Sequence, residues 1–80
     1  MPSQRIRLIR LRNNLTQEYV AFRAGISQSQ LSKYETGESV PNAAMLRVLA
    51  DILHVELFEF FYESEEAIRN AIRRWEAREQ

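Results

Sequence analysis

Residues 17–36 of the chain read QEYVAFRAGISQSQLSKYET. This pattern is typical of two short helices that are joined by a sharp turn and cross at a steep angle. Close contact between two such helices requires a small side chain, and Ala21 is suitably placed to supply it. Four residues later, Gly25 can adopt the left-handed backbone conformation that a tight turn requires.

Capping signals mark where each of these two helices begins. Thr16 is a favourable N-cap for a first helix over about 17–23. Ser27 and Gln30 form the capping-box pattern Ser-x-x-Gln, which predicts a second helix over about 27–35. The order of helix, glycine turn and helix therefore follows from local signals alone.

The side chains of this stretch divide into an apolar group and a polar group. The apolar group, which we expect to seal the helix pair against the rest of the domain, is Val20, Ala24, Ile26, Leu31 and Tyr34. The polar group, which we expect to point outward from the second helix, is Gln28, Ser29, Ser32 and Lys33. Amide, hydroxyl and ammonium groups with little bulk are suited to hydrogen bonding with base edges, although they are also common on ordinary protein surfaces.

Helical patterns continue on both sides of the pair. A first helix is expected over about 4–13, a fourth over about 42–53 and a short fifth over about 56–62. The fourth carries an inward stripe of Met45, Leu46, Leu49, Ala50 and Leu53. Ile68, Ala71, Ile72 and Trp75 follow the i, i+3, i+4, i+7 rule and predict a last amphipathic helix that begins near Ser64. We therefore predict an all-α fold with a domain over 1–62 and an additional C-terminal helix within 63–80.

Composition restricts the class of protein. Eighty residues suffice for one domain, and the formal net charge is zero. Residues 1–50 carry seven basic and three acidic side chains, whereas residues 51–80 carry four basic and eight acidic ones. This asymmetry favours one face that meets phosphates, with chance scatter of surface charges as the alternative.

Several functional classes are not expected. The chain has no cysteine and a single histidine, and it lacks a phosphate-binding glycine loop and an evident pair of carboxylates. We therefore expect no enzymatic activity, no metal site, no cofactor and no small-molecule ligand. No apolar run approaches the ~20 residues that span a bilayer, and no signal-peptide pattern opens the chain, so a cytoplasmic location without a membrane partner is expected.

The stretch from Arg5 to Phe61 resembles the phage repressor/Cro-like, or XRE-type, helix-turn-helix family. The residues that carry the resemblance are Arg10, LTQEYVAFRAGISQSQLSKYETG (15–37), Pro41 and LRVLADILHV (46–55). The resemblance covers about three quarters of the chain and needs no gap through the motif. It implies a five-helix, repressor-like DNA-binding domain that binds operator DNA as a dimer, with the second motif helix in the major groove.

The resemblance also implies roles for individual residues. The base-reading group is Gln28, Ser29, Lys33 and Ser32. The group that contacts DNA phosphates is Gln17, Ser27, Tyr34, Thr36, Ser39 and Asn42. Arg10 and Glu35 match positions that commonly form an internal ion pair, although Arg10 could instead contact a phosphate.

The sequence departs from the family pattern at two places. The loop after the recognition helix reads Glu38-Ser39-Val40, where family members often carry Lys or Arg. Since each lost phosphate contact lowers the salt-dependent part of the affinity, we expect weak binding by a monomer. His54 replaces a common glycine between the fourth and fifth helices, which predicts a histidine in the left-handed conformation.

The aromatic run Phe58, Phe60, Phe61 and Tyr62 is too large to be buried entirely in so small a domain. We expect part of it to form a dimer interface together with the tail helix. The residues expected there are Phe58, Phe61, Tyr62, Ile68, Ile72 and Trp75. The tail could also pack on an outward Leu8/Leu11 patch or only on its own domain, and Arg69, Arg73 and Arg74 form either a solvated face or a second DNA contact.

Together these features predict a sequence-specific transcriptional regulator, a repressor in the first instance, that binds a palindromic operator as a homodimer. The size also suits an autoregulating controller protein of a restriction–modification system or a small phage-type repressor. The alternative is a protein-interaction module, such as an antitoxin, that uses the same fold to bind a partner chain.

Overall fold

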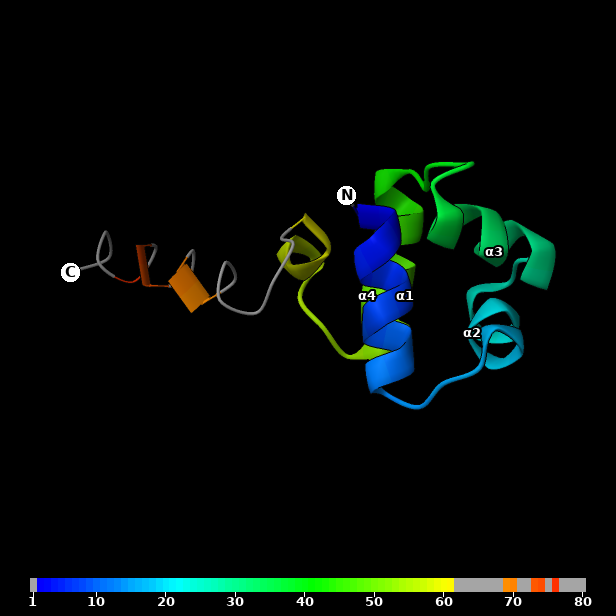
Figure 1. Cartoon of the computed structure of the whole chain (residues 1–80), viewed down its shortest axis with the longest axis horizontal. Coiled ribbons are helices and arrows are strands. Elements are labelled where there is room, and N and C mark those ends of the chain that lie inside the picture. The colour runs from blue at the N-terminus through cyan, green and yellow to red at the C-terminus, as the bar shows by residue number, and fades with distance from the viewer. Residues whose placement is uncertain (1, 62–68, 71–72, 75, 77–80) are drawn as a thin grey trace.

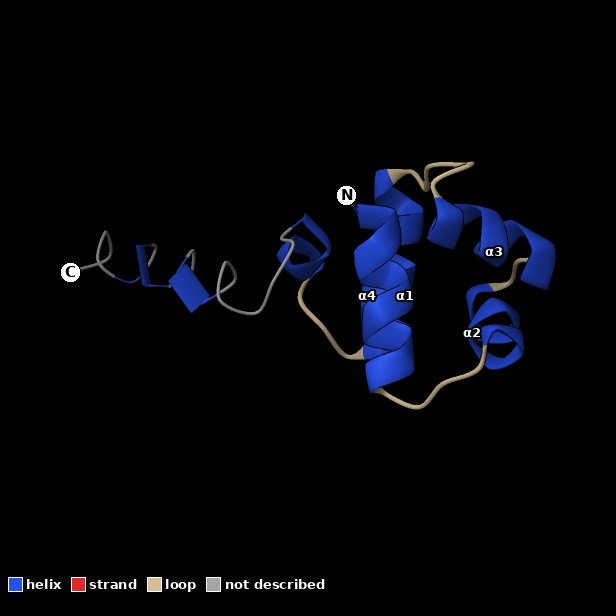
Figure 2. Cartoon of the chain, in the orientation of Figure 1, coloured by secondary structure: helices blue, strands red, loops and turns tan. Residues whose placement is uncertain are grey.

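The computed structural model describes residues 2–61, 69–70, 73–74 and 76. Its elements are α1 (Pro2–Arg12), α2 (Gln17–Ala24), α3 (Gln28–Thr36), α4 (Ala43–Leu53) and a 3-10 helix, η1 (Leu57–Phe61). Within these ranges the chain forms helices and connecting loops and contains no strand, as Figure 2 shows. The predicted all-α class is therefore confirmed.

Two details of the predicted architecture differ or stay open. The fifth helix, expected over 56–62, is the 3-10 helix η1, so the structure has four α-helices in the predicted domain. The extra C-terminal helix and the domain boundary between 62 and 63 lie largely outside the described residues. Both therefore stay predictions.

Helix α1 occupies the centre of the molecule. It contacts α3 on one side and η1 on the other, and it also touches α4 (Figure 1). Helix α2 packs against α3 and α4, so the motif pair α2–α3 contacts α1 through α3 and α4 through α2. This arrangement makes α1 the element through which α3 and η1 are joined.

Each of α1, α2, α3, α4 and η1 contributes at least one buried side chain to the hydrophobic core. Its buried members are Ile6, Ile9, Val20, Ala21, Leu31, Leu46, Leu49, Ala50, Leu53 and Phe60. Four of the five predicted inward residues of α4 are buried, and Met45 is half-buried against the same cluster. Full burial of a large apolar side chain contributes about 1.5–3 kcal/mol, so this shared cluster is the main source of stability for the short helices.

Side-chain caps begin three of the helices. The Thr16 Oγ1 accepts from the amide three residues on at 3.0 Å, as predicted. The Ser27 Oγ and the Asn42 Oδ1 accept the equivalent amides of α3 and α4 at 2.9 and 2.8 Å. Because each cap satisfies a helix amide that lacks an intrahelical partner, each contributes on the order of 1 kcal/mol.

Helices α2 and α4 end in the same way. Gly25 and His54 adopt left-handed conformations with φ of 72° and 58°, as predicted for both. The amides that follow them donate to the Ala21 and Ala50 carbonyls, each at 3.0 Å, which is the hydrogen bond of a Schellman closure. The Gly25 turn sets the angle between α2 and α3. No helix in the described part of the chain is long and apolar enough to cross a membrane.

Candidate nucleic-acid interface

Helix α3 has an inner and an outer face. Leu31 and Glu35 point into the molecule and are 0% and 5% exposed. Gln28, Ser29 and Lys33 are exposed on the outer face, and Ser32 is half-buried at its edge. The four residues that the resemblance places in the base-reading group thus share the outer side of one nine-residue helix.

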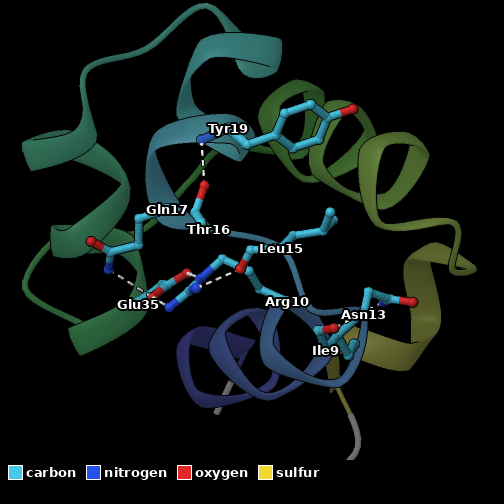
Figure 3. A network of polar contacts seen from close by, with 8 residues as sticks. All are labelled: Ile9, Arg10, Asn13, Leu15, Thr16, Gln17, Tyr19 and Glu35. Atoms are coloured by element: carbon cyan, nitrogen blue, oxygen red, sulfur yellow. Dashed lines mark hydrogen bonds and ion pairs between the residues drawn. The ribbon is translucent and has the colours of Figure 1, made fainter.

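A buried polar network holds the inner face of α3 in place. The Arg10 guanidinium donates from Nε to the Glu35 Oε2 at 2.6 Å and from Nη2 to Oε1 at 3.0 Å. The Gln17 Nε2 donates to the same Oε1 at 2.9 Å, and the Arg10 Nη1 donates to the Leu15 carbonyl at 2.8 Å (Figure 3). The network therefore ties α1, the loop after it, α2 and α3 to one carboxylate.

This geometry bears on the two roles considered for Arg10. Its side chain is 9% exposed and that of Glu35 is 2% exposed. All three guanidinium nitrogens of Arg10 already donate within the protein. The arrangement supports the structural role over a phosphate contact, because a phosphate would have to compete with a bidentate, desolvated carboxylate.

The residues predicted to contact phosphates near the start of α2 and α3 keep donors available. Gln17 uses one amide hydrogen on Glu35, and the second amide hydrogen can still donate. Ser27 is exposed and its oxygen accepts the amide of Gln30, so its hydroxyl hydrogen can donate outward. Both residues thus brace the motif and carry a donor that a phosphate could accept.

The other predicted phosphate contacts surround the end of α3. Asn42 is exposed, and because its Oδ1 caps α4, its amide hydrogens remain as donors. Thr36 is exposed, but its Oγ1 donates to the Lys33 carbonyl at 3.2 Å and would have to rotate to donate elsewhere. Tyr34 is half-buried.

Gln30 departs from its predicted role. The capping-box pattern places its side chain on the backbone of Ser27, but the Gln30 Nε2 instead donates to the Ser39 Oγ at 3.2 Å. Ser39 also donates its amide to the Lys33 carbonyl at 3.2 Å. The loop after α3 is therefore fastened to α3, because the side-chain amide of Gln30 binds Ser39 instead of the backbone of Ser27.

An open hollow of about 800 Å³ lies where α1 faces the end of α3. Its lining consists of Arg7, Leu8, Arg10, Gln17, Ser32, Glu35 and Thr36. The Arg10–Glu35 pair is buried, whereas Arg7 and Thr36 are exposed. The hollow thus adjoins the outer face of α3. Across the described ranges, no group of three or more His, Asp or Glu side chains is placed to hold a metal ion.

The aromatic run is partly buried and partly exposed, as expected for so small a domain. Phe60 is 0% exposed in the core, whereas Phe58 and Phe61 are 38% and 56% exposed. Tyr62, Ile68, Ile72 and Trp75, the other residues predicted at a dimer interface, lie outside the described residues. Leu8 and Leu11 are exposed on α1, as predicted.

Two features of the fold were not predicted from the sequence. Arg5 is only 6% exposed and donates from Nε to the Glu59 carbonyl at 3.2 Å, joining α1 to η1. Its spacing of four residues from buried Ile9 was the available signal, because i and i+4 share a helix face. Phe22 is 80% exposed on α2, and no local pattern distinguished it from a core residue.

Comparisons with known proteins agree with this geometry. A model of the helix-turn-helix family matches residues 6–60. Among solved structures, the chain is similar to the restriction-modification controller protein C.AhdI from Aeromonas hydrophila, with 30% sequence identity and a TM-score of 0.70. The match covers 74% of this chain and 89% of that one. No match was found among the curated proteins.

Proposed function

Because this chain belongs to the XRE-type helix-turn-helix family of DNA-binding regulators, we propose that it is a repressor that binds a palindromic operator as a homodimer. The observation that carries the proposal is the outer face of α3, where Gln28, Ser29 and Lys33 are exposed. The buried Arg10–Glu35 pair fixes the opposite face. A rigid helix with small polar groups outward is suited to the major groove.

Gln28 and Ser29 read bases from the first turn of α3. The Gln28 amide can donate to and accept from the edge of adenine in a bidentate contact, which discriminates by about 1–3 kcal/mol. Ser29 can donate or accept at several base edges. Lys33 lies one turn further along and Ser32 lies beside it, so both extend the base-reading surface.

Phosphate contacts set the position of α3 in the groove. Gln17 and Ser27 serve this purpose at the N-terminal ends of the motif helices. Tyr34, Thr36, Ser39 and Asn42 do so around the loop that follows α3. The Gln30–Ser39 hydrogen bond supports this assignment, because it holds the loop at a defined place beside the recognition helix.

A dimer supplies the affinity and selectivity that one domain lacks. The loop after α3 carries Glu38 and no basic residue, so a single domain makes few charged phosphate contacts. Exposed Phe58 and Phe61 provide apolar surface for a two-fold interface, joined by Tyr62, Ile68, Ile72 and Trp75. Two recognition helices then read half-sites about one helical turn apart, at about 34–36 Å.

The cellular role we propose is control of restriction–modification genes from the cytoplasm, including the gene for the regulator itself. The similarity to a restriction-modification controller protein supports this narrower role. The protein acts by binding alone and performs no chemical step. Transcription of these genes then depends on the fraction of operator that the protein occupies.

A second candidate is a partner-binding module such as an antitoxin. The observation that favours it is the aromatic surface of α2, where Phe22 is 80% exposed and Tyr19 is 43% exposed. In that case the partner covers α2, and the outer face of α3 has no ligand. A gel shift with random duplex at low salt separates the two candidates, because only the regulator shifts the duplex.

The decisive experiment is selection of bound duplexes from a random DNA library with the full chain. A palindromic consensus with half-sites about 10–10.5 base pairs apart is the expected result. A single asymmetric site contradicts the dimer. Failure to enrich any sequence contradicts base reading by α3.

A further inference from the structure

Arg7 stands at the rim of the hollow between α1 and α3, and no role for it follows from the family resemblance. Its side chain is exposed and lines the hollow together with Ser32 and Thr36 of α3. It lies three residues before Arg10, on the side of α1 that faces the recognition helix. The α1 face beside the outer side of α3 is therefore basic.

The charged side chains that line the hollow have a net positive charge. Arg10 and Glu35 neutralise each other in the buried pair at its base. Among the described residues, no carboxylate is paired with Arg7. The hollow consequently carries one uncompensated positive charge, and that charge is on the exposed side chain at its mouth.

We propose that Arg7 binds a backbone phosphate of the DNA at the rim of this hollow, beside the recognition helix. The inference rests on the proposed function, since α3 must enter the major groove to bring a phosphate there. The groove is about 12 Å wide, so a helix seated in it has a phosphate backbone along each flank. Arg7 serves the flank on the α1 side, where Ser32 and Thr36 of α3 line the same hollow.

The lining of the hollow matches a phosphate diester. The Arg7 guanidinium presents several N–H groups in a plane and can donate two of them to phosphate oxygens. Ser32 contributes a hydroxyl on the α3 side of the same space. The Glu35 carboxylate does not repel the phosphate strongly, because Arg10 donates to both of its oxygens and Gln17 donates to Oε1 as well.

The test compares Arg7→Gln with Arg23→Gln in the full chain. Arg23 is exposed in the last turn of α2, so its substitution changes the net charge equally but at the end of α2 away from Gln17. Dissociation constants for the selected operator and for a random duplex are measured from about 50 to 200 mM salt. One lost phosphate contact lowers the slope of log affinity against log salt by about 0.9, or about 1.8 for a dimer.

Arg7→Gln is therefore expected to lower the slope of log affinity against log salt on both duplexes. Between about 50 and 200 mM salt, the fold loss of affinity of the variant dimer should be about 12 times smaller than that of the unaltered chain. Arg7→Lys is expected to keep the steeper slope, and Arg23→Gln to leave the slope unchanged. If Arg7→Gln and Arg23→Gln give the same slope while the unaltered chain binds tightly, the assignment of Arg7 is wrong. If the unaltered chain binds neither duplex, the proposed function fails as well.

Discussion

Glu35 of α3 accepts two hydrogen bonds from Arg10 of α1, at 2.6 and 3.0 Å, in the interior of the domain. The partners are 25 residues apart and come from the helix at the centre of the fold and the helix with the predicted base-reading face. Since Gln17 also donates to Glu35, the first motif helix shares the same anchor. The orientation of α3 thus depends on one carboxylate.

Breaking this pair on one side should strongly destabilise the fold. Arg10→Met leaves the Glu35 carboxylate buried with Gln17 as its remaining donor, and an uncompensated buried charge costs about 3–5 kcal/mol. Urea unfolding followed by circular dichroism should show a free energy of unfolding lower by that amount.

The matched control is the double variant Arg10→Met/Glu35→Leu. It removes both charges and places apolar groups in the same space, so it should recover much of the stability lost in Arg10→Met. A double variant that is less stable than the single one contradicts the view that the stranded charge causes the loss.

Gln28→Ala tests base reading. If the Gln28 amide contacts a base edge, the variant should lose about 1–3 kcal/mol of operator binding per half-site and tolerate other bases at one position of each half-site. Its affinity for random duplex should stay unchanged, because the phosphate contacts remain. Competition gel shifts with operators altered base by base measure both effects. Equal weakening on operator and random DNA contradicts the assignment.

Gly25→Ala isolates backbone strain in the turn of the motif. A Cβ at residue 25 meets no atom within 4 Å, so the added methyl group causes no clash. With φ at 72°, the cost is the left-handed penalty of about 1–2 kcal/mol. Thermal and urea unfolding should show this loss, and Gly25→Asn should lose less because asparagine tolerates this conformation. An unchanged stability for Gly25→Ala contradicts the left-handed conformation of residue 25.

His54→Gly is expected to act in the opposite direction. His54 ends α4 with φ of 58°, a conformation that costs a side-chain-bearing residue more than a glycine. The larger conformational entropy of glycine in the unfolded chain offsets part of this relief. The free energy of unfolding should therefore rise by about 0.5–1 kcal/mol. His54→Ala retains the strain and should show no such gain. Urea unfolding of the three chains provides the comparison, and a loss of stability in His54→Gly overturns it.

Phe61→Ser tests the dimer interface. Because Phe61 is 56% exposed, its replacement should leave the fold intact and shift the sedimentation equilibrium toward monomer. Phe60→Ala is the contrasting variant, since Phe60 is 0% exposed and its loss should cost about 3–5 kcal/mol of folding free energy. A Phe61→Ser chain that dimerises as strongly as the unaltered chain excludes this aromatic surface from the interface.

Local chemistry accounts for the features that could be predicted from the sequence. The Thr16 cap, the left-handed Gly25 and His54, and the inward stripe of α4 all depend on residues within about four positions of one another. Helix periodicity and capping act over that range. The Arg10–Glu35 pair followed from the family resemblance and not from spacing alone.

What the sequence by itself determined is the helix order, the motif turn and the polar outer face of α3, because these depend on periodicity, caps and glycine conformations within single elements. The tertiary structure alone decided that Gln30 reaches Ser39, that Arg5 is buried against η1, and that Phe60 rather than Phe61 enters the core. These outcomes join residues brought together by the angles at which helices pack. A buried donor takes whichever acceptor that packing places within reach.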